Sequence, residues 1–228
     1  DSSLQILSEV VKNSIDSRDY LLQNDIISTL ESMKLTYSVA ELLESLCSLD
    51  PPPLAQFIPS IAGFISQLID GSELTIFELG LSSLLSLLQN NAEGIDADQF
   101  QNYLPTIFYS ETKLVPLALK ILMLTQNPQP IFPELLLGIL EGENFPDIRD
   151  NLTVLLLITK LFAHFEPIWR PIVQDQLFLL LEAKIGTSKF KIDIEIIQTM
   201  MLYYDNSHLN DKDFFNILLR FSDSNEIG

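Results

Sequence analysis

The side chains that could carry out chemistry in this 228-residue chain are few and lie far apart in the sequence. Neither histidine, His164 or His208, has a second histidine or a cysteine nearby, which a zinc site would need. The single cysteine, Cys47, occupies an apolar position in the run VAELLESLCSL, so we expect a buried thiol and not a nucleophile. We therefore predict no metal, no cofactor and no cysteine–histidine catalytic pair.

Acidic residues recur in closely spaced pairs, and general acid–base catalysis uses such a pair when a cleft places two carboxyls in different environments. The pairs are Glu41 and Glu44, Asp96 and Asp98, and Asp211 and Asp213. All lie at expected helix starts or on polar helix faces, where an acidic side chain caps the helix or complements its dipole. No HExxH or GxSxG motif and no glycine-rich phosphate loop occurs. The chain is therefore predicted not to be an enzyme.

The charge of the chain limits the classes of partner. There are 31 acidic residues against 13 lysines and arginines, which gives a formal net charge of −18. Such a surface repels nucleic-acid phosphates and anionic lipid headgroups, and no basic residue occurs between Lys34 and Lys113. We expect no direct nucleic-acid binding. The acidic surface either keeps an apolar-rich chain in solution or docks a basic partner, and the sequence leaves both interpretations open.

The elements that position these residues are predicted to be helices throughout. Hydrophobic residues make up 47% of the chain and recur at helical spacing, while only 8 glycines are present for tight turns. The fold class is therefore all-α, and no linker is long enough to mark a domain boundary. The expected helices cover residues 2–14, 18–33, 37–49, 54–70, 73–90, 97–109, 112–126, 131–141, 146–164, 168–183, 190–204 and 211–221.

The stretch NLTVLLLITKLF, residues 151–162, is among the most apolar in the chain. Its uninterrupted apolar part runs from Val154 to Ile158, far short of the roughly 20 residues that a membrane span needs. We predict no membrane span and expect a buried helix wall instead. No secretory segment opens the chain, so we expect the sequon at Asn151 to be unused and the protein to be cytoplasmic or nuclear.

A proline-centred pattern repeats along the chain. It occurs in FIPSIAGFISQLI, YLPTIFYS, IFPELLLGIL and WRPIVQDQLFLLL, around Pro59, Pro105, Pro133 and Pro171. Each proline follows an aromatic or apolar residue by one or two positions, and apolar residues come after it. Irregular spacing weakens the signal, but four occurrences predict a repeated helical unit.

These segments resemble the HEAT and armadillo class of α-helical repeats, and residues 131–162 match best, with Pro133, Asp147 and the pair Ile148-Arg149 at the expected positions. The resemblance implies an α-solenoid of stacked antiparallel helix pairs in one continuous domain. Residues 1–53 would form an N-terminal cap or degenerate repeat, residues 54–204 about four pairs, and residues 205–228 the first helix of a further or capping repeat.

The resemblance also implies a function, because such solenoids bind other proteins on the concave surface that the second helices line. We expect a non-enzymatic scaffold or adaptor that forms part of a larger complex and binds a protein partner, with a basic segment as one possibility. The alternative is a regulatory or assembly-chaperone subunit of a complex. The candidate partner-binding residues are Glu73, Glu78, Ser82, Lys113, Lys120, Asp150, Lys160, Trp169, Arg170 and Glu195. For Trp169 and Arg170, packing against a neighbouring unit stays open beside a partner contact.

Overall fold

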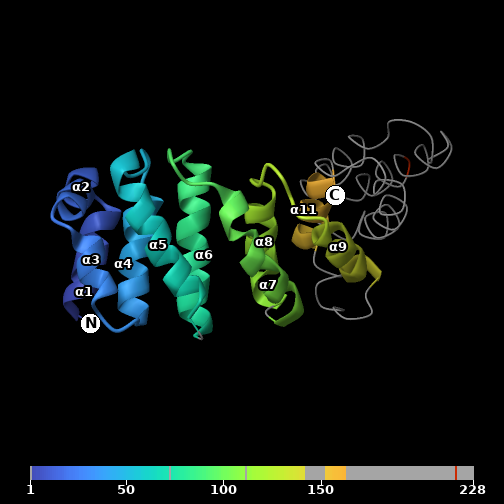
Figure 1. The fold of residues 1–228 in the computed structure, drawn as a ribbon, viewed down its shortest axis with the longest axis horizontal. Coiled ribbons are helices and arrows are strands. Elements are labelled where there is room, and N and C mark those ends of the chain that lie inside the picture. The colour runs from blue at the N-terminus through green and yellow to red at the C-terminus, as the bar shows by residue number, and fades with distance from the viewer. Residues whose placement is uncertain (1, 72, 111, 142–151, 163–218, 220–228) are drawn as a thin grey trace. The chain divides into compact units, whose positions relative to one another are not determined.

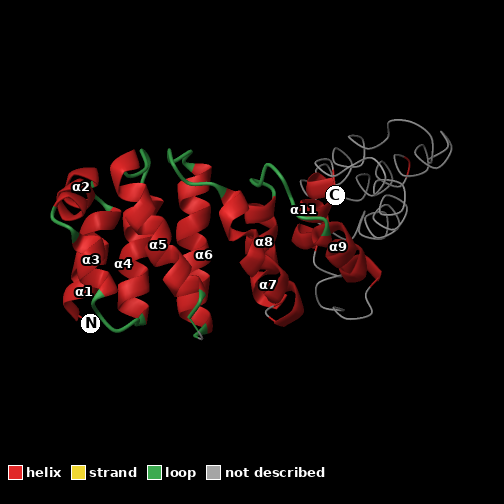
Figure 2. Ribbon diagram, viewed as in Figure 1, coloured by secondary structure: helices red, strands yellow, loops and turns green. Residues whose placement is uncertain are grey.

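The computed structural model of the protein describes residues 2–71, 73–110, 112–141, 152–162 and 219 (Figure 1). Over these residues the regular structure is helical and no strand occurs, which confirms the predicted all-α class for this part of the chain (Figure 2). The α-helices are α1 (Ser2–Lys12), α2 (Ile15–Gln23), α3 (Ile26–Glu31), α4 (Tyr37–Ser48), α5 (Ile58–Ile69), α6 (Leu74–Gln89), α7 (Leu104–Ser110), α8 (Val115–Leu122), α9 (Ile131–Glu141) and α11 (Leu152–Phe162). The 3₁₀ helices are η1 (Ala55–Phe57), η2 (Ala97–Tyr103) and η3 (Thr112–Leu114).

The predicted helix over residues 18–33 is wrong in one respect, because the chain breaks there into α2 and α3. Asp25 has a left-handed backbone with φ 57° and ψ 40°. Asparagine and aspartate tolerate this conformation better than other non-glycine residues, and their side chains compete for local hydrogen bonds. Here Asn24 Nδ2 donates to the carbonyl oxygen of Tyr20 at 2.7 Å, and Ser28 Oγ donates to Asp25 Oδ1 at 2.8 Å. The break is therefore a turn that these short polar side chains stabilise.

Prolines open helices rather than interrupt them. Pro59, Pro105 and Pro116 are each the second residue of an α-helix, and each of these helices directly follows one of the 3₁₀ helices. Proline lacks the backbone N–H that would have no partner in a first helical turn, and its fixed φ suits that turn. The pattern read from the sequence is thus a pattern of helix starts. Pro133 is likewise the third residue of α9, whereas Pro171 lies outside the described residues.

The chain divides into two compact units, of which the first contains residues 1–104 and 120–127. In this unit α1 packs against α4, α4 against α6, α5 against α6, and α3 against α5. The central helix α4 is buried along most of its length, and its fully buried side chains are Val39, Ala40, Leu42, Leu43, Ser45, Leu46 and Cys47. The prediction that Cys47 is a buried thiol is confirmed.

Close packing of α5 on α6 depends on Gly80. A Cβ atom at this position would lie 3.0 Å from Leu68 Cβ and 3.2 Å from Ile69 Cγ1. Contacts this short force neighbouring atoms to move, so a side chain at residue 80 would push the two helices apart. Glycine therefore permits the close approach of these helices.

The second unit contains residues 105–119 and 128–228, and its described part has its own apolar core. The rings of Phe108 and Phe132 are both fully buried and meet edge to face, with centroids 6.5 Å apart. In α11 the side chains of Val154, Leu155 and Ile158 are buried as well. None of the described helices is long and apolar enough to cross a membrane.

Truncation of Leu156 tests the burial of the stretch NLTVLLLITKLF. This side chain on α11 is 7% exposed. Its replacement by alanine removes buried methyl groups and leaves a cavity, so we expect Leu156→Ala to lower the free energy of unfolding by about 2 kcal/mol or more. Urea unfolding followed by circular dichroism measures the loss. Wild-type unfolding behaviour in this variant would contradict the burial of α11.

Candidate functional site

The structure places three of the predicted partner-binding residues between the N-cap and the middle of α6. Glu73 is the N-cap residue, is exposed, and accepts a hydrogen bond from Thr75 Oγ1 at 3.0 Å. Glu78 is also exposed, and Ser82, one turn further on, is half-buried. Residues four apart lie on one face of a helix, so Glu78 and Ser82 share a face that differs from the buried one with Ile76 and Leu84.

The other predicted partner-binding residues lie elsewhere. Lys113 is exposed in η3 of the second unit, and Lys120 is exposed on α8 within the first unit. Lys160 is half-buried on α11 of the second unit. Four further candidates fall outside the described residues, namely Asp150, Trp169, Arg170 and Glu195. The role of the whole set in partner binding stays a prediction.

A cluster of charged side chains joins α1 to α4. Lys12 Nζ lies 3.6 Å from Glu41 Oε1 and 3.9 Å from Glu9 Oε1. Glu44 lies one turn further along α4 and is half-buried; burial raises the pKa of its carboxyl, Lys12 opposes the shift, and Glu41 adds to it. Burial and the negative charge of Glu44 also raise the pKa of the Cys47 thiol, with Arg18 acting in the opposite direction. A thiol held in its neutral form is a poor nucleophile, so Cys47 is suited to a role in packing.

The raised pKa of Glu44 makes stability depend on pH. A carboxyl that holds its proton more tightly in the folded state than in the unfolded state lowers the free energy of unfolding as pH rises above the ordinary glutamate range. We therefore expect Glu44→Gln to be more stable than wild type at pH 7, and expect this difference to vanish below about pH 4, under the ordinary glutamate pKa. Urea unfolding across this pH range tests it. A variant less stable than wild type at pH 7 would show that the ionised carboxylate stabilises the fold.

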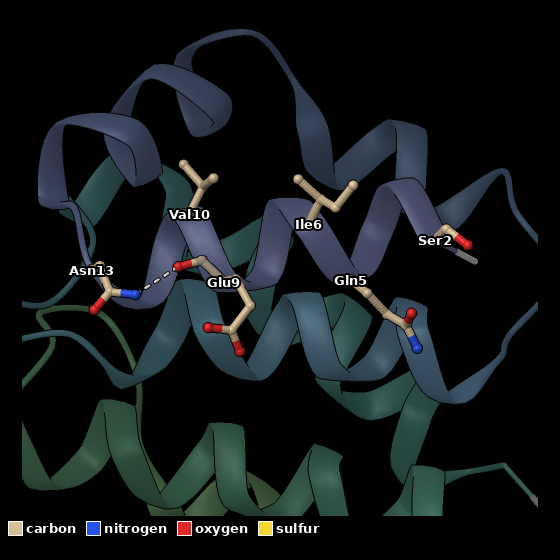
Figure 3. A pocket seen from close by; sticks show the side chains of 6 residues that line it. All are labelled: Ser2, Gln5, Ile6, Glu9, Val10 and Asn13. Carbon is tan, nitrogen blue, oxygen red and sulfur yellow. Dashed lines mark hydrogen bonds between the residues drawn. The ribbon is translucent and has the colours of Figure 1, made fainter.

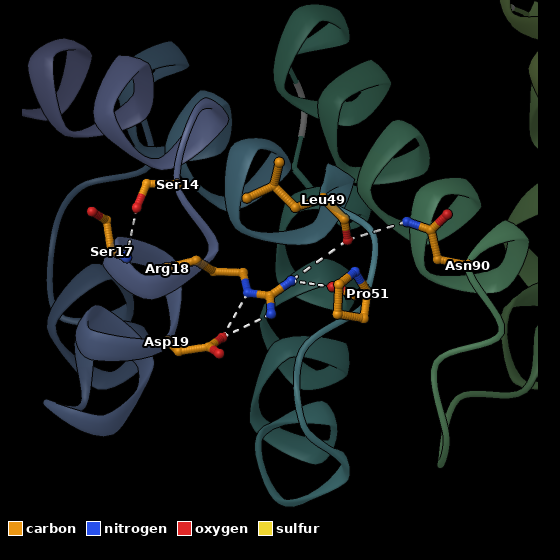
Figure 4. Close-up of polar contacts among 7 residues, drawn as sticks. All are labelled: Ser14, Ser17, Arg18, Asp19, Leu49, Pro51 and Asn90. Carbon is orange, nitrogen blue, oxygen red and sulfur yellow. Dashed lines mark hydrogen bonds and ion pairs between the residues drawn. The ribbon is translucent and has the colours of Figure 1, made fainter.

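A buried arginine ties α2 to the turn after α4, as Figure 4 shows. Arg18 is 1% exposed, its Nε donates to Asp19 Oδ1 at 2.8 Å, and its Nη2 lies 2.8 Å from the same oxygen. Its Nη1 donates to the carbonyl oxygens of Pro51 and, at 3.5 Å, Leu49. Asn90, the C-cap residue of α6, donates through Nδ2 to the same Leu49 oxygen at 3.4 Å. This role of Arg18 was not predicted from the sequence, because its acceptors on Leu49 and Pro51 come from a distant part of the chain.

The pair Asp96 and Asp98 has a structural role. Asp96 is the N-cap residue of η2, where its carboxylate accepts from the Asp98 backbone N–H at 2.9 Å, which confirms the predicted cap. The Asp98 carboxylate accepts instead from the backbone N–H groups of Gln126 and Asn127, at 3.0 Å and 3.2 Å. It also accepts from the Gln101 side chain at 3.1 Å. Asp96 thus caps η2, and Asp98 holds the segment after α8 against η2.

A shallow groove on the surface of α1 was not predicted from the sequence (Figure 3). It has a volume of about 480 Å³ and is lined by Ser2, Gln5, Ile6, Glu9, Val10 and Asn13. Ile6 is 65% exposed and Val10 is 46% exposed, although both are large apolar side chains. Ile6 and Val10 lie one turn apart, so together they form a small exposed apolar patch.

The described residues contain no group of three or more histidine, cysteine, aspartate or glutamate side chains that could hold a metal ion. No protein-family model matches the chain, and no curated protein matches it either. The arrangement of the helices and the chemistry of their surfaces are therefore what indicates a function.

Proposed function

We propose that this chain is an α-helical repeat protein of the HEAT and armadillo type that acts as a non-enzymatic scaffold or adaptor. The observation that carries the proposal is the order of helix contacts in the first unit. Helices α1, α4 and α6 touch in succession, while α3 and α5, which lie between them in the sequence, touch each other. Apart from α2, which contacts both α1 and α3, consecutive helices of this unit thus fall alternately into two rows. Alternation of this kind is how helix pairs stack in repeat proteins.

The succession of contacts also accounts for the wide apolar surface of these helices. An isolated antiparallel helix pair leaves apolar surface uncovered, and a neighbouring pair buries it. The fully buried side chains of α4 agree with this arrangement, because α1 and α6 both cover that helix. A stack of this kind offers a preformed surface for another protein, without the cost of ordering a flexible segment.

The surface charge supports a basic partner. The chain carries a formal net charge of −18, and Glu73 and Glu78 are exposed on one half of α6. Complementary charge speeds encounter with a basic segment and selects it over acidic competitors, while apolar contacts between helices supply affinity. We infer that α6 contributes to the surface that receives such a segment.

A charge-reversal experiment in cells tests the proposed function. The full-length protein is captured from its native cell as wild type, as Glu73→Lys/Glu78→Lys, and as the control Glu31→Lys/Glu93→Lys, which makes the same charge change at exposed residues elsewhere. We expect the first double variant to lose the principal bound proteins and the control to keep them. Retention by both variants would contradict a role for α6, and equal loss would indicate unspecific attraction.

A second candidate function is favoured by exposed apolar side chains. Tyr20 and Tyr109 are each more than 60% exposed, as is Ile6. A regulatory or assembly subunit that is stable only within its complex would expose such groups when alone. Any bound partner raises the melting temperature, so the two candidates are told apart by the chain alone: a subunit that is stable only within its complex would show no cooperative melting transition without its partner, whereas a free-standing scaffold would.

A further inference from the structure

One face of α1 is covered by α4, and another face is exposed. Leu4, Ser8 and Val11 are buried on the face that packs against α4. Ile6 and Val10 project from another side of the helix, where both are exposed (Figure 3). Helix α4, by comparison, is covered by α1 and by α6. Among the described helices of this row, α1 therefore retains an apolar surface that its neighbours do not cover.

The shape of the groove on α1 fits a helix. Its lining residues fall into two rows with spacing of four, Ser2–Ile6–Val10 and Gln5–Glu9–Asn13. Rows at this spacing form the ridges of a helix surface, and helices pack by placing a ridge of one into the groove between two ridges of the other. The Asn13 side chain is held in its row by the hydrogen bond from its Nδ2 to the backbone carbonyl oxygen of Glu9, 2.8 Å long. The space between two such rows has the form that can receive one ridge of another helix.

The charge at the groove on α1 indicates what kind of partner would bind there. Among the described residues that line the groove, Glu9 alone is charged, and its side chain is 72% exposed. The nearby Lys12 is shared between Glu9 and Glu41, so Glu9 retains capacity for a further basic partner. A second copy of the chain would bring another Glu9 and another net charge of −18 to the contact. Like charges disfavour that pairing.

We propose that the outer face of α1 binds a basic amphipathic helix of a partner protein. Apolar side chains of that helix would cover Ile6 and Val10, and a lysine or arginine would pair with Glu9. The inference rests on the proposed scaffold function, and it assigns one contact surface and the chemistry of what occupies it.

The experiment uses synthetic helical peptides as probes. One peptide of about 18 residues, or five turns, carries a leucine ridge flanked by lysines, and a second has glutamates in their place. Fluorescence anisotropy measures their binding to the wild-type full chain, Ile6→Ser, Glu9→Lys and the controls Tyr109→Ser and Glu31→Lys. The controls remove an exposed apolar ring and reverse an exposed charge at two residues that are not among those lining the groove. Circular dichroism checks that each variant folds.

We expect the lysine peptide to bind wild type and the glutamate peptide not to bind. Ile6→Ser should raise the Kd of the lysine peptide about tenfold, which corresponds to 1.4 kcal/mol. Glu9→Lys should weaken the binding of the lysine peptide and allow the glutamate peptide to bind. Both control variants should bind the peptides as wild type does. Failure of the lysine peptide to bind, or an equal loss in Glu31→Lys, would overturn the proposal.

Two outcomes separate this inference from the proposed function. If the capture of cellular partners depends on Glu73 and Glu78 but peptide binding is unchanged by substitution of Ile6 and Glu9, the groove proposal is wrong and the scaffold proposal is unaffected. If the peptide results hold but no cellular partner is captured, the scaffold proposal falls. Sedimentation that detects a dimer in wild type but not in Ile6→Ser would assign the groove to a second copy, against the proposal.

Discussion

The variant Phe64→Ala is expected to lose about 3 to 5 kcal/mol of unfolding free energy, the largest effect of any single change considered for this protein. Phe64 lies on α5, its side chain is fully buried, and its helix packs against α6 and α3. Alanine there removes the whole ring and leaves a cavity that the surrounding helices fill only in part. Urea unfolding of the purified protein measures the loss.

The neighbouring Gly63 supplies the matched control. It is exposed on the same helix, and a Cβ atom at this position would meet nothing within 4 Å. Gly63→Ala should therefore raise the unfolding free energy by up to about 1 kcal/mol, since alanine is the better helix former. A loss of less than about 0.5 kcal/mol in Phe64→Ala is what an exposed site would give, and it would mean that α5 does not pack as described.

Replacement of the buried Arg18 is expected to cause the second large loss of unfolding free energy. Arg18→Met keeps much of the side-chain volume but removes the donors to Asp19, Leu49 and Pro51. Breaking a buried ion pair costs about 3 to 5 kcal/mol, and since the Asp19 side chain is 30% exposed and regains some water, we expect a loss of about 3 kcal/mol. Chemical denaturation of the variant and the wild type measures the difference.

The same substitution at an exposed lysine separates the buried contacts from the loss of one positive charge. Lys34 is exposed, so Lys34→Met is expected to stay within about 0.5 kcal/mol of wild type. Arg18→Lys is informative as well, because one ammonium group cannot reach all the acceptors of the planar guanidinium. We expect it to fall between wild type and Arg18→Met. Equal stability of Arg18→Met and Lys34→Met would contradict a tie between α2 and the turn after α4.

The helices could be predicted from the sequence because hydrophobic spacing reports burial directly. In α4, for example, the apolar spacing correctly predicts the buried side chains Val39, Ala40, Leu42, Leu43, Leu46 and Cys47, and Ser45 is buried with them. The break at Asp25 could not be predicted, because the apolar spacing continues across it through Leu22 and Ile27 while the turn depends on one left-handed residue. Periodicity reports which residues are buried but carries little information about a single backbone angle.

The candidate site was predictable to a lesser extent. Helical phase correctly places Glu78 on an exposed face of α6, because Ile76 and Leu84 define the buried side. Helix α1 is different, since it carries two apolar sets, one with Leu4 and Val11 and one with Ile6 and Val10. Only the packing against α4 decides which set is covered. The groove and the buried Arg18 are tertiary features, and a pattern along the chain does not reveal them.

The measurement that tests the central claim most directly is the salt dependence of partner binding. The principal partner captured from cells is purified and titrated against the full-length protein at about 50 mM and about 300 mM salt, because screening strengthens over this range. For an acidic scaffold that receives a basic segment, we expect the Kd to rise about tenfold or more in wild type and much less in Glu73→Lys/Glu78→Lys. A Kd that does not change with salt in either protein would contradict the account.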